Sequence, residues 1–427
     1  MHKYIPRIAD LILEDKLKTS PAVQIRGTMW CGKTTTAKEH ARSVVLMDDP
    51  DEGERNRMLA ESFPRDFLSK QPPLLIDEWQ TVPSLWDAVR HESDRRNEFG
   101  QFILTGSVSP LEEDEENKIH HSGTGRITTM RMRPMTLYES GFSSGQVSIG
   151  SLFDNPVSFV DGESDKTIED IAMALCRGGW PRGVGLPDEV ALELPYNFLE
   201  ETITSRRIKD RKGRKSVQEV ERLLRSYARN ISTQASRVLI AKDMGNDGSR
   251  PFDDETLVSY LKLLESLFII EELPAWNPNI RSSAAVQSAY TRHFSDPSIA
   301  VASLGLNPDS LLSDLKTFGL MFESMCIRDL RTYAERLKGK LYHYRDSTGL
   351  EADAVMVLRD GRWAAIEVKL AGEERIKEGA AHLLKIRDRI DTDKMKAPSF
   401  LMILTAKKHA YMRKDGVYEV PISMLAP

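Results

Sequence analysis

The chain has 427 residues, of which 40% are hydrophobic and 29% are charged, and its formal net charge is -5. This balance supplies apolar material for two or three domains, and it excludes a mainly disordered chain and a generally basic nucleic-acid coat. Three scattered cysteines exclude a disulfide framework and a thiolate metal site. Because there is also no run of about 18 apolar residues, we expect a cytoplasmic protein with no membrane span.

The first 145 residues alternate short apolar runs with charged helical segments. Continuous apolar strands that alternate with helices are typical of a parallel α/β sheet covered on both faces. The expected strands are 22–27, 43–48, 73–78 and 102–107, and the expected helices between them are 33–42 and 84–98. We therefore expect a parallel α/β sheet domain over 1–145, followed by a Ser-, Gly- and Asp-rich linker over 146–166.

The rest of the α/β chain is expected to form two smaller blocks. In the helical block, 167–289, two short helices within 228–244, a longer helix over 254–267 and a short apolar run are typical of a winged helix. The block 290–427 is expected to be a small α/β domain. Its expected elements are a helix at 318–336, strands at 342–346, 351–358 and 362–370, a helix at 373–390 and a strand at 400–405.

A phosphate-binding pattern, GTMWCGKT, occupies 27–34 and fits G-x-x-x-x-G-K-[ST] at every fixed position. Glycines at the first and sixth positions let the backbone curl around a phosphate, Lys33 reaches the β- and γ-phosphates, and the Thr34 hydroxyl binds Mg²⁺. We therefore expect ATP and Mg²⁺ as cofactors. The residues expected to contact the nucleotide in this loop are Gly27, Thr28, Met29, Trp30, Cys31, Gly32, Lys33, Thr34 and Thr35.

Acidic and polar residues follow two further expected strands. Asp77 ends the run PLLID and is placed to hold Mg²⁺ through water, while Glu78 beside it is placed to act as the general base. On the strand 102–107, either Thr105 or Ser107 is placed to sense the γ-phosphate.

Two groups of basic residues are candidates for catalysis and for binding. Arg126 is the expected arginine finger, with Arg131 and Arg133 as alternatives; such a finger often comes from an adjoining subunit, so we expect a homo-oligomer. The basic run RRIKDRKGRK at 206–215 is a candidate contact for the phosphates of DNA.

The segment 351–370 predicts a β-hairpin. A three-residue loop with Gly361 in the left-handed conformation places Asp353 opposite Glu367, with Lys369 on the same face. This is the D…E-x-K arrangement of metal-dependent nucleases, in which Asp353 and Glu367 bind Mg²⁺ and the lysine orients water. Glu323, on the preceding expected helix, is a candidate further acid.

Two alternatives to the nuclease interpretation stay open. In one, Asp353, Glu367 and Lys369, with Glu351 opposite Lys369, form an ordinary ion-pair ladder on the sheet. A two-residue Asp-Gly turn would instead slip the register and place Asp353 opposite Val368.

Several segments together resemble a widespread bacterial and archaeal AAA+ family. GTMWCGKT, LLIDEW, ILTGS and the GRI…RPMTLYES segment are similar to the ATPase half of that family, and five further segments resemble its C-terminal domain of unknown function. The resemblance implies an AAA+ core, a winged-helix-like middle and a restriction-endonuclease-like end. Ala352 stands where active nucleases often have a proline. The five segments are GGWP (178–181), 260–276, HFSDP (293–297), MFESM (321–325) and 351–369.

These features predict a Mg²⁺-dependent ATPase that binds and hydrolyses ATP to drive or gate its C-terminal block, with DNA as the expected partner. Two alternatives are a nucleotide-gated protein-binding or sensor module with slow turnover, and an ATP-controlled nuclease.

Overall fold

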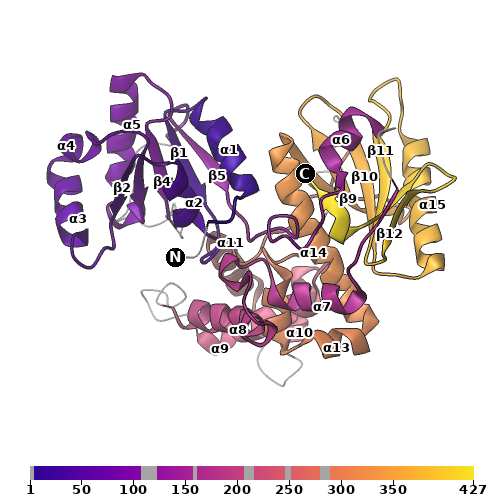
Figure 1. The fold of residues 1–427 in the computed structure, drawn as a ribbon. Coiled ribbons are helices and arrows are strands. Elements are labelled where there is room, and N and C mark those ends of the chain that lie inside the picture. The colour runs from indigo at the N-terminus through magenta and orange to yellow at the C-terminus, as the bar shows by residue number, and fades with distance from the viewer. Residues whose placement is uncertain (1–3, 107–122, 157–160, 206–215, 246–251, 279–288) are drawn as a thin grey trace. The chain divides into compact units, whose positions relative to one another are not determined.

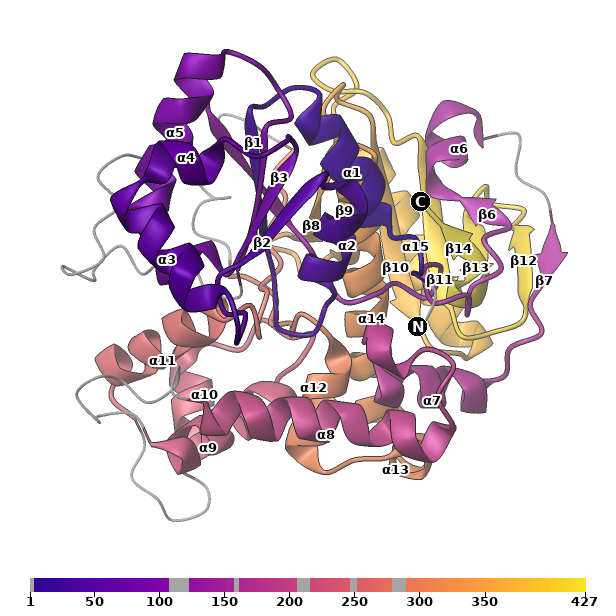
Figure 2. The same ribbon diagram turned by 60° about the vertical axis from the view of Figure 1, so that its left-hand side comes forward.

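The computed structural model describes residues 4–106, 123–156, 161–205, 216–245, 252–278 and 289–427 (Figures 1 and 2). The chain forms two compact units. Unit 1 comprises Met1–Pro134 and Ser266–Phe268, and unit 2 comprises Met135–Glu265 and Ile269–Pro427. Within the described ranges, no helix combines the length and the apolar character that a membrane crossing needs.

Unit 1 is built on a five-stranded parallel sheet in the order β2-β3-β4-β1-β5. Every residue of β3 and of β4 is buried, as a sheet covered on both faces requires. In Figure 1, α3 lies beside β2 and α1 lies beside β5. The strands are β1 (Ala22–Arg26), β2 (Ser43–Leu46), β3 (Leu74–Asp77), β4 (Phe102–Thr105) and β5 (Ile127–Arg131). The helices are α1 (Ile8–Leu17), α2 (Lys33–His40), α3 (Gly53–Ser62), α4 (Pro64–Leu68), η1 (Trp79–Thr81) and α5 (Leu85–Arg96).

The four expected strands and two expected helices of this unit are confirmed, with small differences at their ends. Strand β5 was not expected. It is a partly exposed strand at the edge of the sheet, so its sequence, ITTMR, lacks the continuous apolar run that identifies the central strands.

Unit 2 combines a group of helices with a seven-stranded mixed sheet. After three short elements near its start, helices α7 (Ile168–Arg177) to α13 (Pro308–Ser313) follow, and α14 (Leu315–Arg336) then leads into the main part of the sheet. The helices between α7 and α13 are η4 (Pro181–Gly183), α8 (Asp188–Thr204), α9 (Val217–Arg229), α10 (Arg237–Met244), α11 (Asp254–Ser266) and α12 (Pro297–Leu304). After α11, the chain forms two isolated antiparallel bridges, Ile270–Phe294 and Leu273–Thr291.

The mixed sheet has the order β7-β12-β13-β11-β10-β9-β8. Figure 1 shows it between α14, which contacts β8 to β10, and α15 (Glu373–Arg389), which contacts β9 to β11. The strands are β7 (Gly162–Glu163), β8 (Gly339–Arg345), β9 (Glu351–Leu358), β10 (Trp363–Lys369), β11 (Phe400–Thr405), β12 (His409–Met412) and β13 (Tyr418–Pro421). The short helix η6 (Ile422–Met424) leads into the last strand, β14 (Leu425–Ala426), which pairs with β6 (Val147–Ser148).

The chain divides differently from the expected boundaries. It enters unit 2 at Met135 rather than near residue 145, and the expected linker 146–166 instead contains β6, α6 (Ile149–Asp154) and β7. These short elements pair with β14 and β12 and bury their apolar side chains. Serine and glycine are frequent there because the chain turns often and Ser148 caps α6, so composition alone resembled that of a linker.

Candidate functional site

The phosphate-binding loop connects β1 to α2, as its pattern requires. Gly27 has φ +158°, and a Cβ atom there would lie 2.1 Å from the carbonyl oxygen of Met132, so only glycine fits. Gly32 has φ +99° and caps α2. The Lys33 side chain is buried, and its Nζ donates to the carbonyl oxygens of Gly27 (3.0 Å) and Thr28 (2.8 Å). The loop thus curls around the amino group that is expected to face the phosphates.

The ends of three neighbouring strands converge beside this loop. Asp77, the last residue of β3, pairs with Thr105, the last residue of β4. The Asp77 carboxylate accepts hydrogen bonds from the hydroxyls of Thr34 (2.9 Å) and Thr105. Thr34 and Asp77, which are 43 positions apart in the sequence, therefore meet beside the loop.

The two candidates for γ-phosphate sensing differ in what is described. Thr105 is fully buried and hydrogen-bonded to Asp77, whereas Ser107 lies outside the described residues. The basic run 206–215 also lies outside them.

Glu78 has a left-handed backbone conformation, with φ +53°, between β3 and η1. Its carboxylate accepts a hydrogen bond from Nε2 of Gln80. The Gln80 side chain lies against Gly106, where a Cβ atom would be 2.2 Å from Gln80 Oε1. Sequence reasoning did not identify Gln80, because a glutamine two positions after the acidic pair has no pattern of its own.

Arg7 is a second residue that sequence reasoning did not identify. It caps α1, and its buried side chain donates to the carbonyl oxygen of Cys31 in the loop and to that of Arg133 after β5. A signal for it was present only in the combination of a helix start with a nearby phosphate-binding loop.

The candidate arginine fingers Arg126 and Arg131 lie at opposite ends of strand β5. Arg126 precedes β5, and Ala22 at the start of β1 donates to its carbonyl oxygen, whereas the loop follows the far end of β1. The two ends of a strand of five residues are about 16 Å apart. The half-exposed Arg126 side chain pairs with Asp94 (2.7 Å). Arg131, in contrast, is the register partner of Arg26 on β1, at the end of the strands that leads into the loop.

The side chains and N–H groups around the phosphate-binding loop are of the kinds that bind ATP and Mg²⁺. The loop has a lysine and a helix start, which favour phosphate oxygens, and the Thr34–Asp77 pair offers oxygen ligands. Among the described residues, no group of three or more His, Cys, Asp and Glu side chains is spaced to hold a metal ion. Thr34 and Asp77 are the residues that would hold Mg²⁺, a cation that is usually bound by one or two side chains together with phosphate oxygens and water.

The predicted register of the C-terminal hairpin is confirmed. The N–H of Leu358 donates to the carbonyl oxygen of Arg362 (2.8 Å), and Gly361 has φ +82°. The paired residues run from Trp363–Val357 to Ile366–Ala354, so Asp353 and Glu367 are the next positions. The two-residue turn that would have slipped this register is not formed. The pairs between the ends of the ladder are Ala364–Met356 and Ala365–Val355.

Lys369 lies between the two carboxylates. Its Nζ is 2.5 Å from Glu367 Oε2 and 3.5 Å from Asp353 Oδ2, while Asp353 also accepts from the N–H of Val368 (2.7 Å). The three side chains therefore meet on one side of the sheet. Glu351 pairs with Arg345 (3.8 Å). The ion pairs of Lys369 with both carboxylates also fit an ordinary ion-pair ladder, so that alternative stays open.

Glu367 is the most buried member of this cluster, with 1% of its side chain exposed. Burial, and then the charge of Asp353, raise the pKa of Glu367 to about 7. Its Oε1 makes no hydrogen bond within the described residues, although His382 Nδ1 on α15 lies 3.8 Å away. Burial and Asp353 also raise the pKa of Glu323 well above its ordinary value, so this acid on α14 shares the electrostatic field of the cluster.

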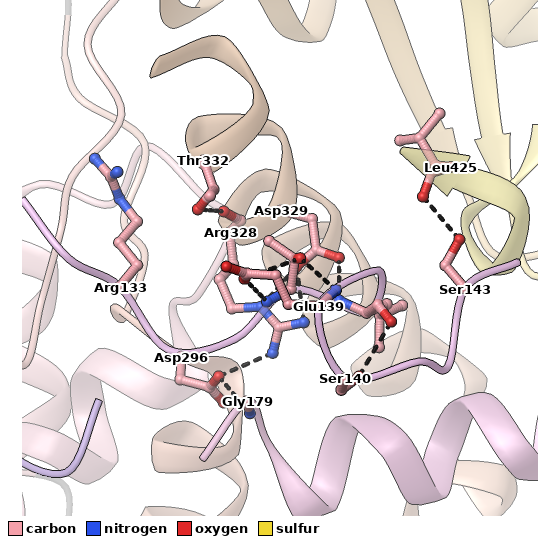
Figure 3. Close-up of polar contacts among 12 residues, drawn as sticks. Arg133, Glu139, Ser140, Ser143, Gly179, Asp296, Arg328, Asp329, Thr332 and Leu425 are labelled. Carbon is pink, nitrogen blue, oxygen red and sulfur yellow. Dashed lines mark hydrogen bonds and ion pairs between the residues drawn. The ribbon is translucent and has the colours of Figure 1, made fainter. Parts of the chain in front are cut away.

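A buried arginine joins three separate segments of unit 2 (Figure 3). Arg328 of α14 contacts Asp296 (2.9 Å) and Asp329 (2.8 Å). Asp296 accepts from the N–H of Gly179, and Asp329 accepts from the N–H of Leu137. The GGWP and HFSDP segments therefore meet at this buried arginine.

Three parts of the chain match known families. Residues 19–141 match a family described as an AAA domain, residues 168–310 match a domain of unknown function (DUF8612), and residues 318–425 match another (DUF4143). A comparison with curated proteins finds no match.

Solved structures show distant similarity. The Walker-type ATPase of Pyrococcus abyssi is 16% identical, with a TM-score of 0.41 over 70% of this chain and 96% of that one. The ORC2 protein of Aeropyrum pernix is 12% identical, with a TM-score of 0.33 over 75% and 96%. The replication initiator DnaA, bound to AMPPCP and single-stranded DNA, is 14% identical, with a TM-score of 0.28 over 61% and 90%.

The family match and the geometry of the loop agree for the first part of the chain. Residues 19–141 form an AAA-type P-loop ATPase domain, and two domains of unknown function follow it.

Proposed function

We propose that the protein is a Mg²⁺-dependent ATPase whose nucleotide cycle drives or gates unit 2, with DNA as the target. The observation that carries the ATPase part is the Asp77 carboxylate, which is bonded to both Thr34 of the loop and Thr105 of the neighbouring strand. The DNA part is supported by the winged-helix-like order of α9 to α11 and by the carboxylate-lysine cluster on β9 and β10.

Each residue has a separate task in this proposal. Lys33 exchanges its hydrogen bonds to the carbonyl oxygens of the loop for bonds to β- and γ-phosphate oxygens. When the Glu78 carboxylate breaks its hydrogen bond with Gln80, it accepts a proton from the attacking water. Mg²⁺ neutralises charge on the phosphates when it is bound. Thr34 and Asp77, whose side chains are joined by a hydrogen bond, would be the residues that hold the cation.

Two variants test the ATPase part. Lys33→Ala should abolish high-affinity ATP binding, whereas Glu78→Gln should bind ATP and fail to hydrolyse it, because the amide cannot accept the proton. Lys38→Ala, on the exposed side of α2, is the matched control and should behave as the wild type. ATP binding that survives Lys33→Ala would overturn the assignment of the site.

The position of Arg126 bears on assembly. Arg126 lies at the end of the strands that is far from the phosphate-binding loop of its own chain. We therefore propose that it acts on the nucleotide of a neighbouring copy in a homo-oligomer. Inactive Arg126→Ala mixed with inactive Glu78→Gln should then regain part of the turnover. A monomer with full activity would rule out this role.

A second candidate function is metal-dependent cleavage of DNA by unit 2. The observation that favours it is the meeting of Asp353, Glu367 and Lys369, with one buried oxygen of Glu367 left without a hydrogen bond in the described structure. Asp353→Asn should abolish Mg²⁺-dependent cleavage and leave ATP turnover unchanged. The absence of cleavage in the wild type, with and without ATP, would leave the cluster as a structural ion pair.

A further inference from the structure

The segment before α1 lies against the phosphate-binding loop and its helix. The Tyr4 hydroxyl contacts Asp10 (2.8 Å) and the Thr36 hydroxyl of α2 (2.9 Å), and His40 at the end of α2 contacts the same carboxylate (2.9 Å). Asp10 also accepts from the backbone N–H of Arg7 (2.6 Å). These four contacts connect Arg7 to the helix that follows the loop.

The Arg7 side chain bridges two backbone carbonyls. Its Nη1 donates to Cys31 (2.8 Å) and its Nη2 donates to Arg133 (2.9 Å), and only 6% of the residue is exposed. The planar guanidinium presents its donors in a fixed fork, which suits two acceptors that must stay at a constant separation. Arg7 therefore holds the loop against the chain that follows β5.

The bond to Cys31 has a consequence for the next peptide group. In a trans peptide, the C=O of one residue and the N–H of the next point in opposite directions. Because Arg7 holds the Cys31 carbonyl toward itself, the N–H of Gly32 is turned away from Arg7. Gly32 caps α2, and N–H groups at a helix start are the donors that bind phosphate.

We infer that Arg7 is a positioning residue for ATP binding, which fixes the Cys31–Gly32 peptide so that the Gly32 N–H faces the phosphates. This inference rests on the proposed ATPase function. Arg7 contacts neither nucleotide nor water in this role; it acts only through the peptide that it orients.

The kinetic signature separates positioning from a general structural role. A phosphate that is bound before hydrolysis stays bound during it, so loss of the Gly32 donor weakens the ground state and the transition state alike, which raises KM and leaves kcat nearly unchanged. A variant that is partly unfolded has fewer active molecules, which lowers the apparent kcat and leaves KM unchanged.

The test compares Arg7→Lys, which keeps the charge but lacks the planar fork that holds two carbonyls at a fixed separation, with the wild type. We expect KM for ATP, and Kd for a non-hydrolysable ATP analogue measured by calorimetry with Mg²⁺, to rise about tenfold, the factor that corresponds to one hydrogen bond. The kcat should change less than about twofold. Arg55→Lys, an exposed arginine of α3, is the matched control and should leave both constants unchanged.

The outcomes distinguish this inference from the proposed function. A wild-type protein that does not bind the analogue sinks the ATPase proposal itself. If the wild type binds it and Lys33→Ala does not, while folded Arg7→Lys keeps the wild-type KM and Kd, only the role of Arg7 is overturned. Arg7→Gln repeats the measurement without the charge if Arg7→Lys does not fold.

Discussion

Asp77 is a carboxylate with two hydroxyl neighbours and very little exposure to water. Thr34 and Thr105 come from different elements, and each donates to it. A hydrogen bond to a charged acceptor is worth about 1.5–3 kcal/mol, and an acceptor that loses its donor inside the protein bears the cost of desolvation. The orientation of Asp77 therefore depends on both hydroxyls.

This dependence predicts the effect of Thr105→Val, which removes the hydroxyl and keeps the shape. We expect the Mg²⁺ concentration for half-maximal ATP turnover to rise several-fold, and the free energy of unfolding to fall by about 1–2 kcal/mol. Mg²⁺ titration of turnover and denaturant unfolding measure the two effects. Thr129→Val, on the exposed part of β5, should change neither. An unaltered Mg²⁺ requirement would contradict the role of Thr105.

At the same scale, the sequence predicted Lys33, Thr34 and Asp77 because each belongs to a pattern whose spacing the chemistry fixes. It did not predict Arg7 or Gln80. Arg7 binds backbone carbonyls, 24 and 126 positions away, and any residue supplies a carbonyl, so no partner type marks the site.

Among the elements, the turn before η4 (Pro181–Gly183) depends on two glycines in the GGWP segment. A Cβ atom on Gly179 would lie 2.2 Å from the carbonyl oxygen of Met135, so a residue with a side chain does not fit at this position. The N–H of Met135 also donates to the carbonyl oxygen of Gly179 (2.6 Å). Two backbones therefore meet here at a distance that excludes any larger residue.

We predict that Gly179→Ala lowers the free energy of unfolding by about 2–3 kcal/mol, because a backbone must move to admit the methyl group. Gly319→Ala is the matched control: no atom lies within 4 Å of its Cβ position on α14, so the free energy of unfolding should rise by about 0.5–1 kcal/mol. Denaturant titration of both variants provides the comparison. Equal effects of the two substitutions would disprove the close approach.

The HFSDP segment contains a buried histidine that favours acid unfolding. His293 contacts the Ser324 hydroxyl (3.1 Å) and faces Arg331, His343 and Glu271. Burial, followed by the charge of Arg331, lowers its pKa well below the ordinary value. The unfolded chain therefore binds a proton near pH 6.5 that the folded chain does not bind.

The sign of the pH effect follows from this difference. The free energy of unfolding should hold above about pH 6.5 and fall as the pH drops below it, by at most about 1.4 kcal/mol per pH unit from this residue. His293→Gln should flatten that fall, and His409→Gln on exposed β12 should not. Urea unfolding between pH 7 and pH 5 measures the slopes. A His293→Gln slope equal to that of the wild type would contradict the assignment.

The accuracy of prediction also varied between elements for physical reasons. The register of β9 and β10 was predictable because the three-residue loop with Gly361 sets it locally. The short strands β6 and β7 were not, because each has only two residues and pairs with a strand hundreds of positions away. Composition cannot separate such strands from a linker.

For the whole molecule, the division into two units has a thermodynamic consequence. Unit 1 has its own core, which includes Trp79 and Phe102, and unit 2 has another, which includes Trp363 and Ile403. Multidomain chains with separate cores commonly unfold in more than one step. The phosphate-binding loop, Asp77 and Glu78 all belong to unit 1.

We therefore predict two thermal transitions, of which nucleotide raises only one. A ligand that binds the folded state alone, at about 100 times its Kd, adds about 2.7 kcal/mol to the stability of the unit that binds it. Calorimetry with a non-hydrolysable ATP analogue and Mg²⁺ should shift the transition of unit 1, and Lys33→Ala should abolish the shift. Gly179→Ala should lower the other transition. A single transition that moves as a whole with nucleotide would mean that the two cores unfold together, and the separation of their stabilities would then be wrong.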